Sequence, residues 1–415
     1  VTLFLIDATY LSETVPLTIG AIPGASAVNT ITLKPAPGVV PVIAKSSNSA
    51  LIKFDGASHF IIDGSNTAGG TTRDLTIRNT STYSWATVVW IASKGAGEPS
   101  SFITITNCYM EGGVVSTNSM GVAITGTSST FSAGESNNHI SISNNQVSKC
   151  LYAITVYGGN TNRASELSIT GNLVGNAASS LYVGKFGIYL LNTTGSEITG
   201  NTIFNIVSSG SGPVGIYLAD KCSEIGVSRN SINNIRYTAT GSGQGRGIVI
   251  STFENPSNIT LVNNIIYNVG GAGYYTITSI GAGIYIYAAN GIELYYNTVN
   301  FYGKRSRSGA TSDFTAALFV GLDVTNVAAK NNIFINSYEN PDGVATGYAV
   351  YVRNSSSPFT AGGVNNNCYF VSGPEGVLFY ANGGEVTTLS GWRSFTGQDA
   401  YSISADPYIE SNTSL

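Results

Sequence analysis

The fold of this chain is indicated by a short stretch that reads Ile103-Thr104-Ile105-Thr106-Asn107-Cys108-Tyr109. Apolar and polar residues alternate over its first four positions, which is the period of a β-strand with one buried face. The same order of residues returns as Ile140-Ser141-Ile142-Ser143-Asn144-Asn145 and as Leu167-Ser168-Ile169-Thr170-Gly171-Asn172. A strand that recurs along the chain in this way predicts a solenoid built from β-strands.

Ten asparagines mark the copies of this strand, and we predict that they form a structural asparagine ladder: Asn79, Asn107, Asn145, Asn172, Asn201, Asn230, Asn264, Asn297, Asn332 and Asn367. Neighbouring copies lie between 27 residues apart (Asn145 to Asn172) and 38 residues apart (Asn107 to Asn145), because loops of a solenoid absorb insertions. Asparagine tolerates the left-handed backbone angles of a bend, and stacked inward amides can hydrogen-bond to the backbone and to each other.

A second strand lies between successive asparagines, as in Gly187-Ile188-Tyr189-Leu190-Leu191 and Gly283-Ile284-Tyr285-Ile286-Tyr287. β-branched and aromatic residues alternate in these strands, which argues against helical repeats, and the repeats are too short for the blades of a propeller. We therefore predict an all-β fold, a parallel β-helix of about ten or eleven coils.

The sequence predicts a single β-helix domain over residues 1–415. Residues 1–74 contain shorter and less regular strands and are expected to form the N-terminal end coils. Regular ladder coils are predicted over 75–370, and the repeat fades in a C-terminal end region over 371–415. The chain starts at Val1, which we interpret as a segment of a mature or longer protein.

The composition excludes several classes of protein. Charged residues make up 10% of the chain, against about 25% in an average soluble domain. The net charge is −4, which argues against the basic face that nucleic-acid binding needs. The apolar runs are too short for membrane insertion. The four cysteines form no CxxC pair, so we interpret them as small buried side chains, with one long-range disulfide left open.

Three features resemble right-handed parallel β-helix domains of the pectate-lyase-like superfamily, especially those in large secreted and cell-surface proteins of Bacteroidetes-type bacteria. The first is the strand-asparagine repeat. The second is Ile61-Ile62-Asp63-Gly64-Ser65-Asn66 followed by Arg73-Asp74-Leu75-Thr76-Ile77-Arg78-Asn79, and the third is Gly397-Gln398-Asp399 followed by Ser404-Ala405-Asp406-Pro407. The resemblance covers the whole chain and implies a right-handed single-stranded parallel β-helix of secreted or cell-surface location.

Because that superfamily includes polysaccharide lyases and glycosidases, we searched the sequence for their catalytic residues. The polygalacturonase-like motifs do not occur in it, and its acidic residues are scattered singly. We therefore predict no catalytic residues, no metal site and no cofactor. We interpret both histidines as structural. His59 is expected in a turn between end coils, where it could contact Asp55 or Asp63, and His139 is expected in a solvated loop.

Tyrosines and cations concentrate in one stretch and form the candidate ligand or partner surface: Tyr285, Tyr287, Tyr295, Tyr296, Tyr302, Lys304, Arg305 and Arg307. Outward aromatic rings can stack on sugars or pack against another protein.

Three functions remain open at this point. The first is a non-enzymatic structural or adhesive module, with homo-oligomer or filament neighbours as partners. The second is a polysaccharide lyase or glycoside hydrolase with an unfamiliar site. The third is an extracellular glycan-binding module that uses the tyrosine-rich face.

Overall fold

The computed structural model describes residues 1–410 except 211, 240–242, 272–279, 305–313 and 340–345. The chain folds as an all-β parallel β-helix of about eleven turns. Two compact units can be distinguished, Val1–Ile203 (unit 1) and Phe204–Leu415 (unit 2), and each is described by itself. The prediction of a single domain with end regions at 1–74 and 371–415 stays a prediction.

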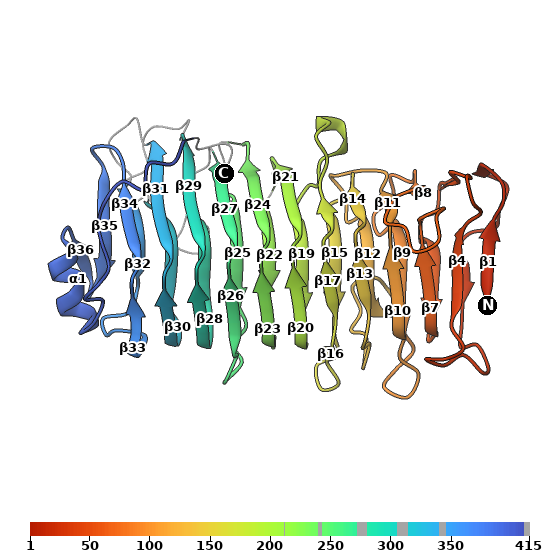
Figure 1. Ribbon diagram of the computed structural model, residues 1–415, viewed down its shortest axis with the longest axis horizontal. Helices are drawn as coiled ribbons and strands as arrows, with labels where there is room; N and C mark the ends of the chain where they lie inside the picture. The colour runs from red at the N-terminus through yellow and green to blue at the C-terminus, as the bar shows by residue number, and fades with distance from the viewer. Residues whose placement is uncertain (211, 240–242, 272–279, 305–313, 340–345, 411–415) are drawn as a thin grey trace. The chain divides into compact units, whose positions relative to one another are not determined.

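Each coil of unit 1 contributes up to three strands, which stack into three parallel sheets (Figure 1). The first sheet holds β1 (Thr2–Leu5), β4 (Ile31–Pro35), β7 (Ser58–Asp63), β10 (Ser101–Thr106), β13 (Ser141–Ser143), β17 (Ser168–Thr170) and β20 (Thr193–Thr199), with the short β16 (Ala164–Ser165) beside β20. The second holds β2 (Thr9–Tyr10), β5 (Val42–Lys45), β8 (Leu75–Asn79), β11 (Cys108–Glu111), β14 (Gln146–Ser148), β18 (Leu173–Val174) and β21 (Thr202–Ser208), within which unit 1 ends. The third holds β3 (Leu17–Ile19), β6 (Ala50–Asp55), β9 (Thr87–Ser93), β12 (Met120–Gly126), β15 (Tyr152–Tyr157) and β19 (Phe186–Leu191).

Unit 2 repeats the same three-sheet plan. Its first sheet holds β23 (Ser223–Ser228), β26 (Ile259–Val262), the second halves of β28 (Gly281–Tyr295) and β30 (Phe314–Lys330), and β33 (Phe359–Asn365). The second holds β24 (Ser231–Tyr237), β27 (Ile265–Gly271), β29 (Thr298–Lys304), β31 (Ile333–Glu339) and β34 (Cys368–Val371). The third holds β22 (Val214–Leu218), β25 (Arg246–Ser251), the first halves of β28 and β30, β32 (Thr346–Val352) and β35 (Gly376–Ala381), which pairs with the antiparallel β36 (Gly384–Val386).

The register stacks like residues directly above one another, which explains why the sequence repeats. In the first sheet of unit 1, Ile105 pairs with Ile142, Ile142 with Ile169, and Ile169 with Ile198. All four side chains are at most 1% exposed. Burying one isoleucine contributes about 2 kcal/mol, so every added coil extends a continuous apolar core.

The asparagines that follow the first sheet are buried and hydrogen-bond along the stack in both units. In unit 1, Asn145 donates from its backbone N–H and its Nδ2 to Oδ1 of Asn172, at 3.0 and 3.2 Å, and Asn172 does the same to Asn201 at 2.9 and 3.0 Å. In unit 2, this geometry continues through Asn230, Asn264, Asn297, Asn332 and Asn367. The second Nδ2 proton reaches a strand carbonyl of the preceding coil, for example Ile142 O from Asn172 at 2.7 Å.

The structure differs from the sequence prediction at Asn79 and Asn107. Tyr109 pairs with Gln146, so the buried position of Asn145 is occupied one coil earlier by Cys108, whose backbone N–H donates to Asn145 Oδ1 at 3.0 Å. Asn79 ends a strand of the second sheet. The sequence stretch before Asn79 resembles a first-sheet strand, which explains why the sequence prediction wrongly assigned Asn79 to the ladder.

A left-handed residue immediately precedes the ladder position, which corrects the prediction that the ladder asparagines themselves make this bend. The backbone φ is 50° at Asn144, 56° at Asn263, 59° at Asn331 and 58° at Asn366. In one coil, Tyr296 fills this position with φ 58° and is 59% exposed. A bulky residue is strained in this conformation, whereas asparagine tolerates it.

Tyr296→Asn is therefore expected to stabilise unit 2 by about 0.5–1 kcal/mol, because it removes left-handed strain from an exposed position. Tyr296→Val is expected to destabilise it, since β-branched residues fit this conformation worst. Urea unfolding followed by circular dichroism measures both variants. A loss of stability in the asparagine variant would contradict the role assigned to backbone strain.

A helix closes the repeat in unit 2, which the sequence did not predict. α1 (Leu389–Thr396) begins at Thr388, whose hydroxyl accepts the N–H of Gly391, and ends at left-handed Gly397 with φ 69°. Its Trp392 is 1% exposed and stacks on Phe379 of β35, with ring centroids 4.5 Å apart. The indole thus helps to bury Phe379 at the last strand of the third sheet that the described residues pair in parallel.

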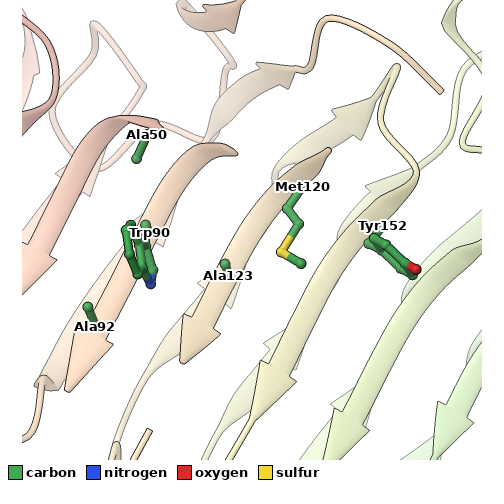
Figure 2. Packing of buried hydrophobic residues seen from close by; sticks show 6 residues of the cluster. All are labelled: Ala50, Trp90, Ala92, Met120, Ala123 and Tyr152. Atoms are coloured by element: carbon green, nitrogen blue, oxygen red, sulfur yellow. The ribbon is translucent and has the colours of Figure 1, made fainter. Parts of the chain in front are cut away.

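The outer face of the third sheet in unit 1 carries a covered hydrophobic cluster. Ala50, Trp90, Ala92, Met120, Ala123 and Tyr152 form it across β6, β9, β12 and β15 (Figure 2). Phe131, from the loop after β12, packs against this cluster together with Leu151 and Phe186. The outside of the third sheet in unit 1 is therefore lined by apolar and aromatic side chains.

Candidate functional site

Three strands of the third sheet in unit 2 form a pocket lined by tyrosines. Its lining residues are Tyr217 of β22, Arg246, Val249 and Ser251 of β25, and Tyr285 and Tyr287 of β28. We call it the tyrosine pocket. Ile248 and Ile250 alternate with Val249 and Ser251 and are fully buried in the core, so strand alternation places Val249 and Ser251 on the opposite face.

Arg246 is the cation of the tyrosine pocket. Its guanidinium lies 4.2 Å from the ring centroid of Tyr285, and its Nε donates to the carbonyl of Ile280 at 2.9 Å. Burial lowers the pKa of Arg246, and the nearby Tyr285 and Tyr217 act in the opposite direction. Arginine keeps its charge even so, which makes the pocket a fixed positive centre in a chain with few charges.

Two tyrosines of the pocket, Tyr217 and Tyr285, remain protonated. Burial raises the pKa of Tyr285 and of Tyr217, and Arg246 partly offsets that rise at both. Phenol hydroxyls that stay neutral can both donate and accept hydrogen bonds. The pocket therefore combines flat aromatic faces, neutral hydroxyls and one planar cation.

Aromatic rings continue from the pocket along the same face of the third sheet. Tyr285 stacks on Phe319 with centroids 4.6 Å apart and an interplanar angle of 8°, and Tyr351 stacks on Tyr380 at 4.3 Å and 5°. Phe319 and Tyr351 lie 5.5 Å apart. Strand register sets this spacing, because Tyr285 pairs with Phe319 and Phe319 with Tyr351.

The residues of the predicted ligand surface lie at different places in the structure. Tyr287 lies in the tyrosine pocket, and Tyr285 lies at its base with 3% of its surface exposed, so it offers little open surface of its own. Tyr295 and Tyr296 belong to the end of β28 and the bend after it. Arg305 and Arg307 lie outside the described residues, so the prediction for these two stays open.

Tyr302 lies at a second concavity of unit 2, on the second sheet, and Lys304 pairs with one of its lining residues. Tyr302, Ile335, Ser337, Glu339, Phe370, Ser372, Asp406, Pro407 and Ile409 line it, and we call it the C-terminal groove. Lys304 pairs with Glu339 at 3.3 Å, with both side chains more than 60% exposed. Such an exposed pair contributes little stability.

Sequence reasoning missed Tyr217 and Arg246. Both occupy third-sheet strands of earlier coils than the tyrosine-rich stretch, and Tyr217 pairs with Val249, which in turn pairs with Tyr285. The recurring Gly-Ile-Tyr of Gly215-Ile216-Tyr217 and Gly283-Ile284-Tyr285 is the signal that could have found Tyr217. Aligning the third strands of all coils reveals it.

The cysteines are free thiols, which answers the question that the sequence left open. Cys108, Cys150 and Cys222 are buried, and Cys368 is partly exposed. Burial raises the pKa of the Cys150 thiol to about 12 and also raises that of Cys108. We expect iodoacetamide to alkylate Cys368 first in the native protein, and all four thiols only after unfolding in urea. Peptide mass mapping measures this order, and early labelling of Cys150 would contradict it.

The described residues were also compared with two requirements, those of a metal site and those of a membrane-spanning helix. Among the described residues, no three His, Cys, Asp or Glu side chains gather in a way that could hold a metal ion. No described helix is long and apolar enough to cross a membrane.

Comparison with solved structures finds similar chains among proteins of diverse kinds. The A-module of mannuronan C-5 epimerase AlgE6 from Azotobacter vinelandii is 13% identical with a TM-score of 0.51, covering 98% of this chain and 91% of that one. A mutant DFA-IIIase from Arthrobacter chlorophenolicus A6 is 13% identical with a TM-score of 0.48, covering 88% and 84%. PfbA, a surface adhesin of Streptococcus pneumoniae, is 12% identical with a TM-score of 0.41, covering 93% and 86%. At 13% identity, the similarity to the AlgE6 A-module shows the fold alone.

A search of curated proteins finds no significant match. The family model for the right-handed β-helix region matches residues 43–300, which is more than half of the chain. Together with the three stacked parallel sheets, this match shows that the chain belongs to the right-handed β-helix family.

Proposed function

We propose that the chain is an adhesive, glycan-binding module of a secreted or cell-surface bacterial protein, and that the tyrosine pocket binds an acidic sugar. One observation carries the proposal: Tyr217, Tyr285, Tyr287 and Arg246 line a single concavity. Tyrosine rings stack on the apolar faces of sugars, and their hydroxyls hydrogen-bond to sugar hydroxyls. Arginine pairs with a carboxylate through two parallel hydrogen bonds.

Rigidity of the site supports the same proposal. The pocket residues project from paired strands, and the stacking of Tyr285 on Phe319 fixes one ring in advance. A preformed site loses little side-chain entropy on binding. A surface with few charges also presents few ions that must be desolvated when a neutral or singly charged glycan approaches.

A glycan array followed by calorimetry tests this proposal. We expect binding of uronate-containing or other carboxylated oligosaccharides by the wild type, and at least about tenfold weaker binding by Tyr287→Ala, which corresponds to about 1.4 kcal/mol. Arg246→Gln is expected to remove the preference for carboxylated over neutral glycans.

Tyr296→Asn is the matched control, because it alters an exposed tyrosine of the same strand region outside the pocket. It should bind as the wild type does. The proposal fails if the array gives no carboxylated hit, or if the Tyr287 variant binds with unchanged affinity.

A second candidate function is glycan cleavage in the C-terminal groove, where Glu339 and Asp406 both line the wall beside Tyr302. Glycosidases use two carboxylates on opposite sides of the scissile bond. Release of reducing sugar from an array hit, lost in Glu339→Gln and in Asp406→Asn, would favour this function over adhesion.

Self-association is the remaining part of the proposal. Leu3 and Phe4 of β1, the first strand of the first sheet of unit 1 (Figure 1), are about half exposed, at 48% and 52%. Exposed apolar side chains can pack against another chain. Sedimentation at increasing concentration should show oligomers that Phe4→Lys disperses; monomers throughout would count against association.

A further inference from the structure

Both histidines of the chain contact the same aromatic ring on the surface of unit 1. Phe102 stacks on His59 with ring centroids 4.6 Å apart and an interplanar angle of 11°, and on His139 at 4.3 Å and 17°. These residues come from successive coils, because Ser101 of β10 pairs with Ser58 before His59 and with Asn138 before His139. We call the three rings the histidine stack.

The backbone of the histidine stack is left-handed at every ring. The φ angles are 57° at His59, 54° at Phe102 and 49° at His139. Glu166 continues the stack with φ 54°, and its carboxylate lies 2.6 Å from His139 Nδ1. Side chains other than glycine and asparagine are uncommon in this conformation. The same bend recurs in other coils, for example at Glu224 and Asn258 with φ 55° and 49°, so it positions the rings one above the other.

A pocket of about 710 Å³ opens beside the stack. His59 and Phe102 form its aromatic side, and small residues, among them Gly20, Ala21 and Gly56, also line it. The volume lies inside the range of about 300–1,000 Å³ typical of small-molecule sites.

The remaining wall of this pocket is the loop between β9 and β10, which supplies Lys94 and Glu98. Lys94 also lies 3.7 Å from Asp55 Oδ2, and the loop is closed by the N–H of Lys94 donating to the carbonyl of Glu98 at 3.0 Å. One cation and one anion thus face the same space, and their charges offset each other.

We propose that this pocket is a second carbohydrate site, which takes a neutral hexose ring. The apolar face of the sugar lies against the His59 ring, which Phe102 covers on one side, and against the edge of Phe102. The sugar hydroxyls hydrogen-bond to Lys94 and Glu98, which can donate and accept respectively. The proposal concerns unit 1 alone and does not rest on the tyrosine pocket of unit 2.

Histidine NMR tests the proposal directly, because the chain contains 2 histidines and labelled histidine gives two imidazole signals. His139→Gln assigns them. Titration with the methyl glycosides of glucose, galactose, mannose and N-acetylglucosamine should shift the His59 signal saturably for at least one sugar, with a Kd on the order of 1 mM. Glycerol, a polyol without a ring, should leave the signal in place.

Three variants show whether the sugar occupies this pocket. Ala21→Trp fills the pocket from an exposed position and should abolish the shift, whereas Tyr287→Ala should preserve it. Lys94→Met, which changes an exposed side chain, should weaken binding at least about threefold. No shift with any of the four sugars, or a shift that survives Ala21→Trp in a folded protein, would overturn the proposal.

Discussion

Replacing Asn297 by alanine is expected to destabilise unit 2 by about 3–5 kcal/mol, the largest effect of any single change in a ladder coil. The amide of Asn297 uses its full hydrogen-bonding capacity. Nδ2 donates to the carbonyl of Leu261 at 2.8 Å and to Asn332 Oδ1 at 3.0 Å, and Oδ1 accepts both the backbone N–H and Nδ2 of Asn264, at 3.1 and 3.0 Å.

Alanine would leave several of these partners unpaired in the core, since Asn297 and Asn264 are fully buried. Each unpaired buried group costs about 1–3 kcal/mol, and a cavity adds to that cost. Asn297→Asp retains the acceptor but buries a charge, so it should be no less damaging.

Urea unfolding followed by circular dichroism measures the effect, with Asn263→Gly as the matched control. Asn263 is adjacent to Asn264 and left-handed with φ 56°, a conformation that glycine adopts freely. We expect the control to stay within about 0.5 kcal/mol of the wild type. An equally stable Asn297→Ala would show that the buried amides contribute little.

Asp399→Ala is expected to release the C-terminal end of unit 2 at a cost of about 3–5 kcal/mol. The Asp399 carboxylate is 1% exposed. Its Oδ2 accepts the hydroxyl of Tyr369 and the indole N–H of Trp392, both at 2.9 Å, and its Oδ1 accepts the hydroxyl of Ser402. One side chain therefore ties α1, β34 and the segment after α1 together.

Removal of the carboxylate leaves these three donors without their acceptor in a buried space. The last ladder residue is affected as well, because the backbone N–H of Asn367 donates to Ser402 Oγ at 2.7 Å. Hydrogen exchange read by mass spectrometry should show loss of protection over 389–402 and around β34.

Asp406→Ala is the control for this second prediction, since Asp406 is an exposed acid of the same terminal segment. It should leave exchange over 389–402 unchanged. Protection that persists in Asp399→Ala would mean that the stacking of Trp392 on Phe379 holds α1 by itself.

Much of the fold could be predicted because one coil resembles the next. Alternating residues such as Ile105, Ile142 and Ile169 indicate strands, and regular asparagines indicate where coils repeat. Register was harder, because a shift of one residue separates Asn107 from the buried position that Cys108 occupies. α1 was missed since its eight residues carry no helical repeat long enough to recognise.

The candidate sites were less predictable because they join residues from different coils. Tyr287 stands in the tyrosine-rich stretch, but Arg246 and Tyr217 come from other strands and approach it only through parallel pairing. The histidine stack has the same origin: His59 and His139 are 80 positions apart in sequence and meet on Phe102 because three coils superpose. In the sequence, each histidine by itself indicates only a turn or a loop.

Proton NMR of a carboxylated oligosaccharide incubated with the protein tests the central claim most directly. Our account predicts saturation transfer from tyrosine ring protons to the sugar, diminished in Tyr287→Ala, while the sugar spectrum stays unchanged over many hours. New anomeric or alkene signals that grow with time would contradict the account, because they would identify the bound glycan as a substrate.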